Sequence, residues 1–408
     1  MKPNRVEHWD RRISYAAGFY FIASVANATL KTILPIPDVY WSRLSAFWGV
    51  LIILSFVSCI KEVYRRNARL LIMSYAVFIT VYLISIIQSL ARSEPTQLIL
   101  TGSALLTLAW WIPVGVYCST VKNYSILYDA LLKCSYVISA LALSMFFFNP
   151  AESSEIEYNM SFGYFIITPL IFHIHEWQKN HRLWLLFLFI IEFLVILIYA
   201  NRGVLLSIIF FLIYKPFFSG NTKYWFIKIS SVCVIMFMLT VYMNDIILWL
   251  LNLFEQFGYQ SRSLSMIVSG TIEATSGRDE IWQDSYDMIL QRPIFGWGLG
   301  GEFVHLAQIE GAFTPNSSYH PHNGLLQNMV NFGLIIGIIV NILILKPLIG
   351  ITRIKNIYCK ELIMVYGSAM VIPCCVSASG FFILPAVALY LYLYYFPYKD
   401  KIIKIKNV

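Results

Sequence analysis

Residues 183–216 read LWLLFLFIIEFLVILIYANRGVLLSIIFFLIYKP, and this stretch decides the class of fold. Two apolar runs, 183–200 and 203–216, meet at a tight joint that contains Arg202. Similar runs recur along the chain, and about 17–22 apolar residues suffice to cross the hydrocarbon core of a bilayer. The runs are continuous and do not alternate with polar residues, which disfavours a β-barrel. The stretch therefore predicts a pair of membrane-spanning helices.

The whole chain shares this character. Of its 408 residues, 58% are hydrophobic and 13% are charged, whereas a soluble domain carries about 25% charged residues. The mean hydropathy is +0.67. These values exclude a soluble enzyme, a disordered protein and a secreted disulfide scaffold, and we expect an all-α polytopic membrane protein. Twelve spans are predicted: 14–34, 44–60, 70–90, 98–118, 128–149, 160–174, 183–200, 203–216, 225–243, 325–345, 362–379 and 381–397.

The net charge of +8 reflects the placement of Lys and Arg. Basic residues concentrate in the cytoplasmic loops of membrane proteins. With the N-terminus in the cytoplasm, only seven of the 30 basic residues fall on the outer face: Lys31, Arg43, Arg92, Arg202, Arg262, Arg278 and Arg292. The positive charge is therefore a topology signal, and no nucleic-acid partner is expected.

One connection is too long for an ordinary loop. Residues 244–324 form an insert on the outer face, between the N-terminal bundle of nine spans (1–243) and the last three spans with their basic tail (325–408). Loops of this length without secondary structure are uncommon. We therefore expect short amphipathic helices at 246–256 and 278–290, packed over the bundle.

Two arginines of the outer face are candidates for binding an anion. Arg202 lies at or just under the membrane surface, where an ionisable side chain is costly. Arg278 opens the expected helix 278–290, and a helix N-terminus favours anions. The guanidinium group is a bidentate donor suited to phosphate. The alternatives are an Arg202 that reaches back to the headgroups and a surface ion pair of Arg278 with Asp279 or Glu280.

Two further motifs follow in the insert. Residues 293–301, PIFGWGLGG, lack the Lys-Ser/Thr of a P-loop. We interpret them as a tight turn whose backbone packs closely against another part of the chain. His322 precedes Asn323, a residue suited to cap the tenth span. A histidine can act as a general base near neutral pH; the alternative is a polar residue at the membrane interface.

Two polar features lie within the spans. Residues 173–176, HIHE, suggest a metal site, but without a third convincing ligand none is expected. Glu192 stands in the middle of the seventh span, where two readings remain open. It either pairs with a polar neighbour or has a role in function.

Four motifs occur in order along the chain: Asn201-Arg202-Gly203, Gly277-Arg278-x-x-x-Trp282, Pro293-x-x-Gly296-x-Gly298 and His322-Asn323-Gly324-x-Leu326. Each motif alone is weak, but the ordered set is fairly specific. Spread over about residues 198–340 of a twelve-span chain, it resembles the O-antigen polymerase and O-antigen ligase superfamily.

The resemblance implies a glycosyltransferase of the GT-C type at the outer face of the bacterial inner membrane. Its donor is a glycan on undecaprenyl pyrophosphate, so neither a nucleotide nor a metal or other cofactor is expected. Arg202 and Arg278 are the expected pyrophosphate-binding residues, and His322 is the expected acceptor of the proton from the attacking sugar hydroxyl. In-line attack at the anomeric carbon predicts inversion. Three aromatic residues are candidates for stacking on sugar rings: Trp282, Tyr319 and Tyr259.

The activity has alternatives. A polymerase passes the chain to the next lipid-linked repeat unit, and a ligase passes it to the core of lipopolysaccharide; the motifs around Arg202 and Arg278 favour the polymerase. A transporter or flippase is disfavoured, because the distinctive polar residues cluster on one face. The expected partners are undecaprenyl-pyrophosphate-linked oligosaccharides as donor and acceptor, with a chain-length regulator and a flippase of the same pathway.

Overall fold

The computed structural model describes residues 5–34, 37–91, 107–147, 160–199, 202–218, 278–309, 320–376 and 384–398, with isolated positions between 230 and 256. Every regular element in these residues is a helix. Five of the described helices are long and apolar enough to cross a membrane: Arg5–Ile33, Tyr40–Ala91, Tyr124–Phe146, Gly324–Arg353 and Ile357–Val376. The expectation of an all-α membrane protein is confirmed, and the count of twelve spans stays a prediction.

The described helices follow one another along the chain: α1 (Arg5–Ile33), α2 (Asp38–Ala91), η2 (Thr107–Trp111), α3 (Ile112–Thr120), α4 (Tyr124–Phe147), α5 (Met160–Asn180), α6 (Leu183–Tyr199), α7 (Arg202–Phe218), α10 (Arg278–Gln291), α11 (Gly301–Ile309), α12 (Gly324–Gly350), η4 (Ile351–Arg353), α13 (Ile357–Tyr366), η5 (Gly367–Val371), α14 (Ile372–Val376) and α15 (Pro385–Tyr395). Each apolar run predicted from the sequence contains helix, except 225–243, which lies outside the described residues apart from one position.

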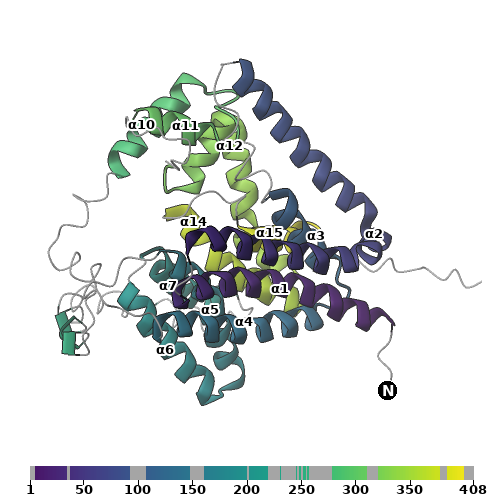
Figure 1. The fold of residues 1–408 in the computed structure, drawn as a ribbon, viewed down its shortest axis with the longest axis vertical. Helices are drawn as coiled ribbons and strands as arrows, with labels where there is room; N and C mark the ends of the chain where they lie inside the picture. Colours follow the sequence, from purple (N-terminus) through teal and green to yellow (C-terminus); the bar gives the residue numbers. More distant parts are fainter. Residues whose placement is uncertain are drawn as a thin grey trace, which may run out of the picture.

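The core of the molecule is a bundle in which α1 packs against α2 and α4, α5 against α6, and α3 against α15 (Figure 1). Large apolar side chains fill the spaces between these pairs, among them Ile13, Leu131, Phe172 and Tyr390. Helices in a bilayer associate mainly through such close van der Waals packing. The bundle is therefore a scaffold on which the outer elements rest.

Helix α2 consists of two helices joined at Asn67, whose φ of −153° and ψ of 61° are not helical. The first half lies along the bundle beside α1, and the second half leaves the bundle and runs to the group formed by α10, α11 and α12 (Figure 1). We call this second half, residues 68–91, the α2 arm. Its far end is attached to that group, because the Leu299 N–H donates to Ser85 Oγ at 3.0 Å.

Helix α12 is also broken, at Gly333, where φ is 78° and ψ is 172°. Asn328 Nδ2 donates to Asn341 Oδ1 at 2.8 Å, although residues 13 apart in a straight helix lie about 20 Å apart. Residues 324–332 therefore fold back antiparallel to residues 334–350, and we call the pair the α12 hairpin. The span predicted over 325–345 lies within the candidate membrane span Gly324–Arg353, but its helix is interrupted at Gly333.

Two buried polar networks lie inside the bundle. Asp10 of α1 pairs with Arg66 of α2 and accepts the Asn123 N–H at 3.0 Å. Glu192 of α6 lies 2.9 Å from His173 Nδ1 of α5, and both side chains are fully buried. The reading in which Glu192 pairs with a polar neighbour is thereby confirmed.

Candidate functional site

The outer elements share a small hydrophobic core of their own, built from α10, α11, the turn between them and the first half of the α12 hairpin. The buried side chains of this core are Met288, Ile289, Trp297, Leu306, Leu326 and Val330. The predicted helix 278–290 is confirmed as α10, which ends at Gln291, two residues before Pro293. Helix α11 was not predicted, and 246–256 lies mostly outside the described residues. We call this group of elements the outer group.

The turn after α10 is bonded to the broken helix. Backbone N–H groups of Trp297 and Gly298 donate to the Val330 and Asn331 carbonyls at 2.9 and 3.0 Å. In a continuous helix such carbonyls accept from the N–H groups four residues later, and here the N–H groups of the turn take the place of those helical donors. The interpretation of residues 293–301 as a turn packed closely on another segment is confirmed.

Glycines make this close approach feasible. Gly296 and Gly333 have φ values of 62° and 78°, a region that side chains with a Cβ rarely adopt. A Cβ on Gly296 would lie 2.5 Å from the Asn331 carbonyl, and one on Gly333 would lie 2.5 Å from the Ile294 carbonyl oxygen. The motif Pro293-x-x-Gly296-x-Gly298 and the downstream Gly333 thus form one interlocked structure.

Glu302, the second residue of α11, is a buried carboxyl that the motif analysis missed. Its side chain is 1% exposed, and its Oε1 accepts from Gln327 Nε2 at 2.5 Å. The Asn331 amide also donates to it. Burial raises the pKa of Glu302 to about 7, although the hydrogen bonds from Gln327 and Asn331 oppose the increase. The available signal was a lone acid in the apolar stretch 301–309.

His322 lies in a loop that α10 holds in place. Trp282 Nε1 donates to the Pro321 carbonyl at 2.7 Å, and the half-buried His322 ring lies 4.1 Å from the His320 ring. The φ of His322 is 52°. Backbone in this region is costly for a residue other than glycine, and such residues cluster at functional sites. Trp282 thus has a structural contact, and its stacking on sugar stays a prediction.

The predicted cap of α12 is present. Asn323 Oδ1 accepts from the N–H groups of Leu325 and Leu326, both at 3.1 Å. This cap fixes the first turn of α12 directly after His322. His322 is therefore held directly beside a helix N-terminus.

Side chains packed around the Trp297 ring hold the turn against its neighbours. The Arg292 guanidinium lies 3.9 Å from the Trp297 ring centre, and the His305 ring lies 3.8 Å from the same ring. Trp297 Nε1 also donates to the Met288 carbonyl at 2.9 Å. These contacts of Trp297 join α10, the turn and α11, so the elements of the outer group are packed together.

Arg202 and Arg278 are each the first residue of a helix, α7 and α10 respectively. Helix α10 packs on α11 and α12, whereas α7 packs on α5, α14 and η5. The structure thus brings Arg278, Trp282 and His322 into the outer group through α10, while Arg202 begins a helix of the bundle. The side chains of both arginines, and Tyr259 and Tyr319 entirely, lie outside the described residues.

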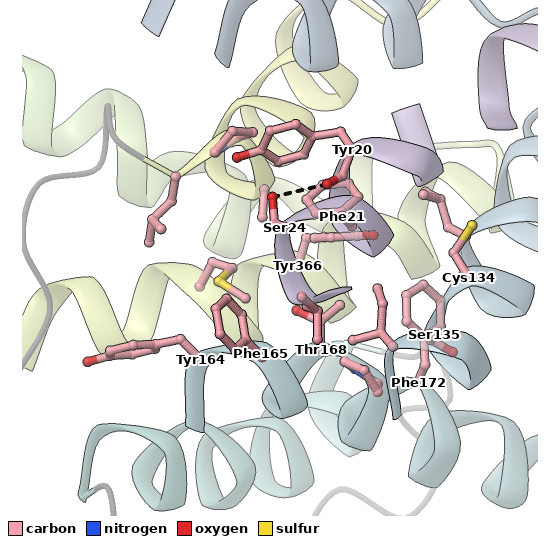
Figure 2. A pocket seen from close by; sticks show the side chains of 18 residues that line it. Tyr20, Phe21, Ser24, Cys134, Ser135, Tyr164, Phe165, Thr168, Phe172 and Tyr366 are labelled. Atoms are coloured by element: carbon pink, nitrogen blue, oxygen red, sulfur yellow. Dashed lines mark hydrogen bonds between the residues drawn. The ribbon is translucent and has the colours of Figure 1, made fainter. Parts of the chain in front are cut away.

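A separate cavity of about 130 Å³ lies inside the bundle, between α1, α4, α5 and the C-terminal helices (Figure 2). Its lining is mostly apolar, and Figure 2 shows Tyr20, Ser24, Tyr164 and Tyr366 around it. It contains no basic side chain. This cavity is therefore unsuited to a pyrophosphate, and the outer group remains the candidate site.

Residues 183–342 match the family model described as O-antigen ligase. This part of the chain is thus similar to the O-antigen ligase family, in agreement with the resemblance of its motifs to the O-antigen ligase and polymerase superfamily. No curated protein and no solved structure matches it. The matched region begins with α6 and ends inside α12, so it includes Arg202, Arg278, Glu302 and His322. The family consists of membrane enzymes of the O-antigen ligase and polymerase type.

Proposed function

We propose that this chain transfers a glycan from undecaprenyl pyrophosphate to a sugar hydroxyl at the outer face of the bacterial inner membrane. The acceptor is the next lipid-linked repeat unit, which makes the chain an O-antigen or capsular polysaccharide polymerase. One observation carries the proposal: Arg202, Arg278 and His322 all stand at the N-termini of helices within the matched domain.

The two arginines stabilise the leaving group. Pyrophosphate accumulates negative charge as its bond to the sugar breaks, and groups already aimed at that charge lower the barrier. Arg202 and Arg278 each combine a guanidinium with the positive end of a helix dipole. Undecaprenyl pyrophosphate is released with both electrons of the broken C–O bond.

His322 acts as the general base. The acceptor hydroxyl oxygen attacks the anomeric carbon from the side opposite the pyrophosphate, so the configuration inverts, and its proton passes to His322. The loop held by Trp282 and the cap made by Asn323 fix the imidazole in place. General-base assistance of this kind contributes about 10²–10⁴-fold to a rate.

A ligase is the second candidate, because the matched family model is described as O-antigen ligase. The ligase uses the same donor and leaving group and differs only in the acceptor, which is the core of lipopolysaccharide. The residues around Arg202 and Arg278 favour the polymerase. A deletion strain analysed on gels for lipopolysaccharide and capsule separates the two activities.

Core that carries a single repeat unit identifies the polymerase, and loss of capsule alone identifies a capsule polymerase. Bare core, with long glycan left on undecaprenyl pyrophosphate, identifies the ligase. Single-repeat carrier held at the cytoplasmic face contradicts both and identifies a flippase.

The residue roles are tested in the same strain. Complementation with Arg202→Ala, Arg278→Ala or His322→Ala is expected to give no long polysaccharide, with normal amounts of protein in the membrane. Arg→Lys at 202 or 278 restores little, because the fork of donors is lost. The matched control is Arg43→Ala, an exposed outer-face arginine of α2, which keeps full activity. Normal polysaccharide from any of the first three variants removes that residue from the site.

A further inference from the structure

A large groove opens between the α2 arm, the second half of the α12 hairpin and α15, apart from the outer group. Its volume is about 1070 Å³. It exists because α2 changes direction at Asn67 and the arm diverges from the bundle (Figure 1). The α2 arm and α12 belong to candidate membrane spans, and we infer that the groove between them faces the bilayer.

The groove is apolar along its walls and basic at one end. Met73 and Val77 of the α2 arm face Val340 and Ile344 of α12 across it. Arg66 and Arg69 line the end beside the break at Asn67. By the distribution of basic residues, this end lies toward the cytoplasm. A ligand that fills the groove thus needs hydrocarbon chains and an anionic group at one end.

The basic end offers free hydrogen-bond donors. Arg66 is 3% exposed; its Nε donates to Glu62 and its Nη1 pairs with Asp10. Its Nη2 is buried and has no hydrogen-bond partner among the described residues. Arg69 is exposed and makes no ion pair within the described part of the chain. An unpaired buried donor is costly, and a phosphate oxygen in the groove satisfies it.

The groove lies far from the reacting end of the proposed donor. The α2 arm contacts the outer group at Ser85, 16 residues beyond Arg69, which corresponds to about 24 Å along a helix. A donor that reacts at the outer group has its pyrophosphate there and not at Arg69. A membrane lipid of the cytoplasmic leaflet fits the observed polarity.

We propose that this groove binds one anionic glycerophospholipid, with its phosphate at Arg66 and Arg69 and its acyl chains between the α2 arm and α12. The choice of this lipid over the lipid-linked donor rests on the proposed transferase activity. Zwitterionic lipid occupies the groove less well, because it brings no net charge to the basic end. Free phosphate has no hydrocarbon chain that could pack against the apolar walls of the groove.

The test is native mass spectrometry of the full chain in detergent, after incubation with phosphatidylglycerol and phosphatidylethanolamine in equal amounts. The wild type is expected to retain phosphatidylglycerol preferentially. Arg69→Gln lowers that retention about fivefold, the effect expected for one basic residue near anionic lipid. The matched control is Arg65→Gln, which removes the same charge from an exposed position outside the groove.

A second pair of variants tests the walls. Val340→Trp fills the groove and is expected to reduce retention, whereas Ile339→Trp, at a residue 51% exposed outside the groove, leaves it unchanged. Equal loss in Arg65→Gln and Arg69→Gln overturns the proposal, because it indicates general surface attraction. Retention of a polyprenyl phosphate in place of phosphatidylglycerol, or equal retention of both phospholipids, also overturns it.

Discussion

Glu302 is the buried titratable residue of the outer group, and its environment predicts a dependence of stability on pH. Its pKa is raised to about 7 by burial. The folded outer group therefore holds a proton that the unfolded chain releases above pH 4.5. Stability is greatest below that pH and is lost as the pH rises through 7, by up to roughly 3 kcal/mol. Thermal unfolding in detergent from pH 5 to pH 8 measures this loss.

Two variants isolate the contribution of Glu302. Glu302→Gln imitates the protonated carboxyl and is expected to remove the pH dependence while the protein stays folded. Glu302→Ala leaves the buried amides of Gln327 and Asn331 without their acceptor, at a cost of about 1–3 kcal/mol for each. An unchanged pH profile in Glu302→Gln contradicts the assignment. Asp279→Asn, at an exposed acid of α10, serves as the control.

From the sequence, candidate residues were identified only where a motif marks them, and their roles stay predictions. Arg202, Arg278 and His322 stand in motifs, and the Asn323 cap follows from its side chain. Glu302 belongs to no motif, and its burial arises only when α11 packs beneath the α12 hairpin. That contact joins residues 25 positions apart, so no local pattern predicts it.

At the scale of elements, the turn 293–301 packs so closely on the α12 hairpin that a single added methyl group is expected to disrupt both structure and activity. Gly333→Ala is expected to abolish polysaccharide formation, because the new Cβ meets a backbone carbonyl at 2.5 Å and φ is positive. Gly296→Ala acts in the same way. Polysaccharide gels and the thermal unfolding of purified protein measure the effect.

The control for these variants is Gly49→Ala, in the first half of α2. A Cβ there finds its nearest neighbour, the Trp110 ring, at 3.9 Å, an ordinary contact. Gly49→Ala keeps wild-type activity and stability. If Gly333→Ala behaves like Gly49→Ala, the break in α12 is not required for function.

Helices were predictable from the sequence where a local pattern of apolar residues marks them. The sequence predicts α10 as a short amphipathic helix over 278–290. The break in α12 was missed, because residues 325–345 read as one apolar run. Three asparagines inside that run, Asn328, Asn331 and Asn341, were the available signal, since buried polar side chains in a span need partners. Two of them bond each other across the hairpin.

At the scale of the whole molecule, the ion pair between Asp10 and Arg66 joins α1, α2 and the start of α4. Both side chains are almost fully buried. Removing Asp10 leaves the buried Arg66 paired with Glu62 and takes away the acceptor of the Asn123 N–H, at a cost of about 1–3 kcal/mol for each buried group left without its partner. Asp10→Ala is therefore expected to lower the thermal midpoint of the purified protein by several degrees.

The exposed pair of Asp129 and Lys133 supplies the comparison, since its members are 59% and 57% exposed. Asp129→Ala is expected to change the midpoint little, because solvent already screens the pair. Equal midpoints for the Asp10 and Asp129 variants contradict a structural role for the buried network. The sequence indicated the all-α membrane class but not which charged residues are buried, because that depends on contacts between distant helices.

The α2 arm has a mechanical consequence. The arm is a helix that leaves the bundle at Asn67 and is hydrogen-bonded through Ser85 to the turn 293–301. About 24 Å separate Arg69 from Ser85 along it. A swing of about 5° around Asn67 displaces the far end by about 2 Å, more than a hydrogen bond tolerates. The hydrogen bond between Ser85 and Leu299 therefore requires that the angle of the arm to the bundle stay within a few degrees.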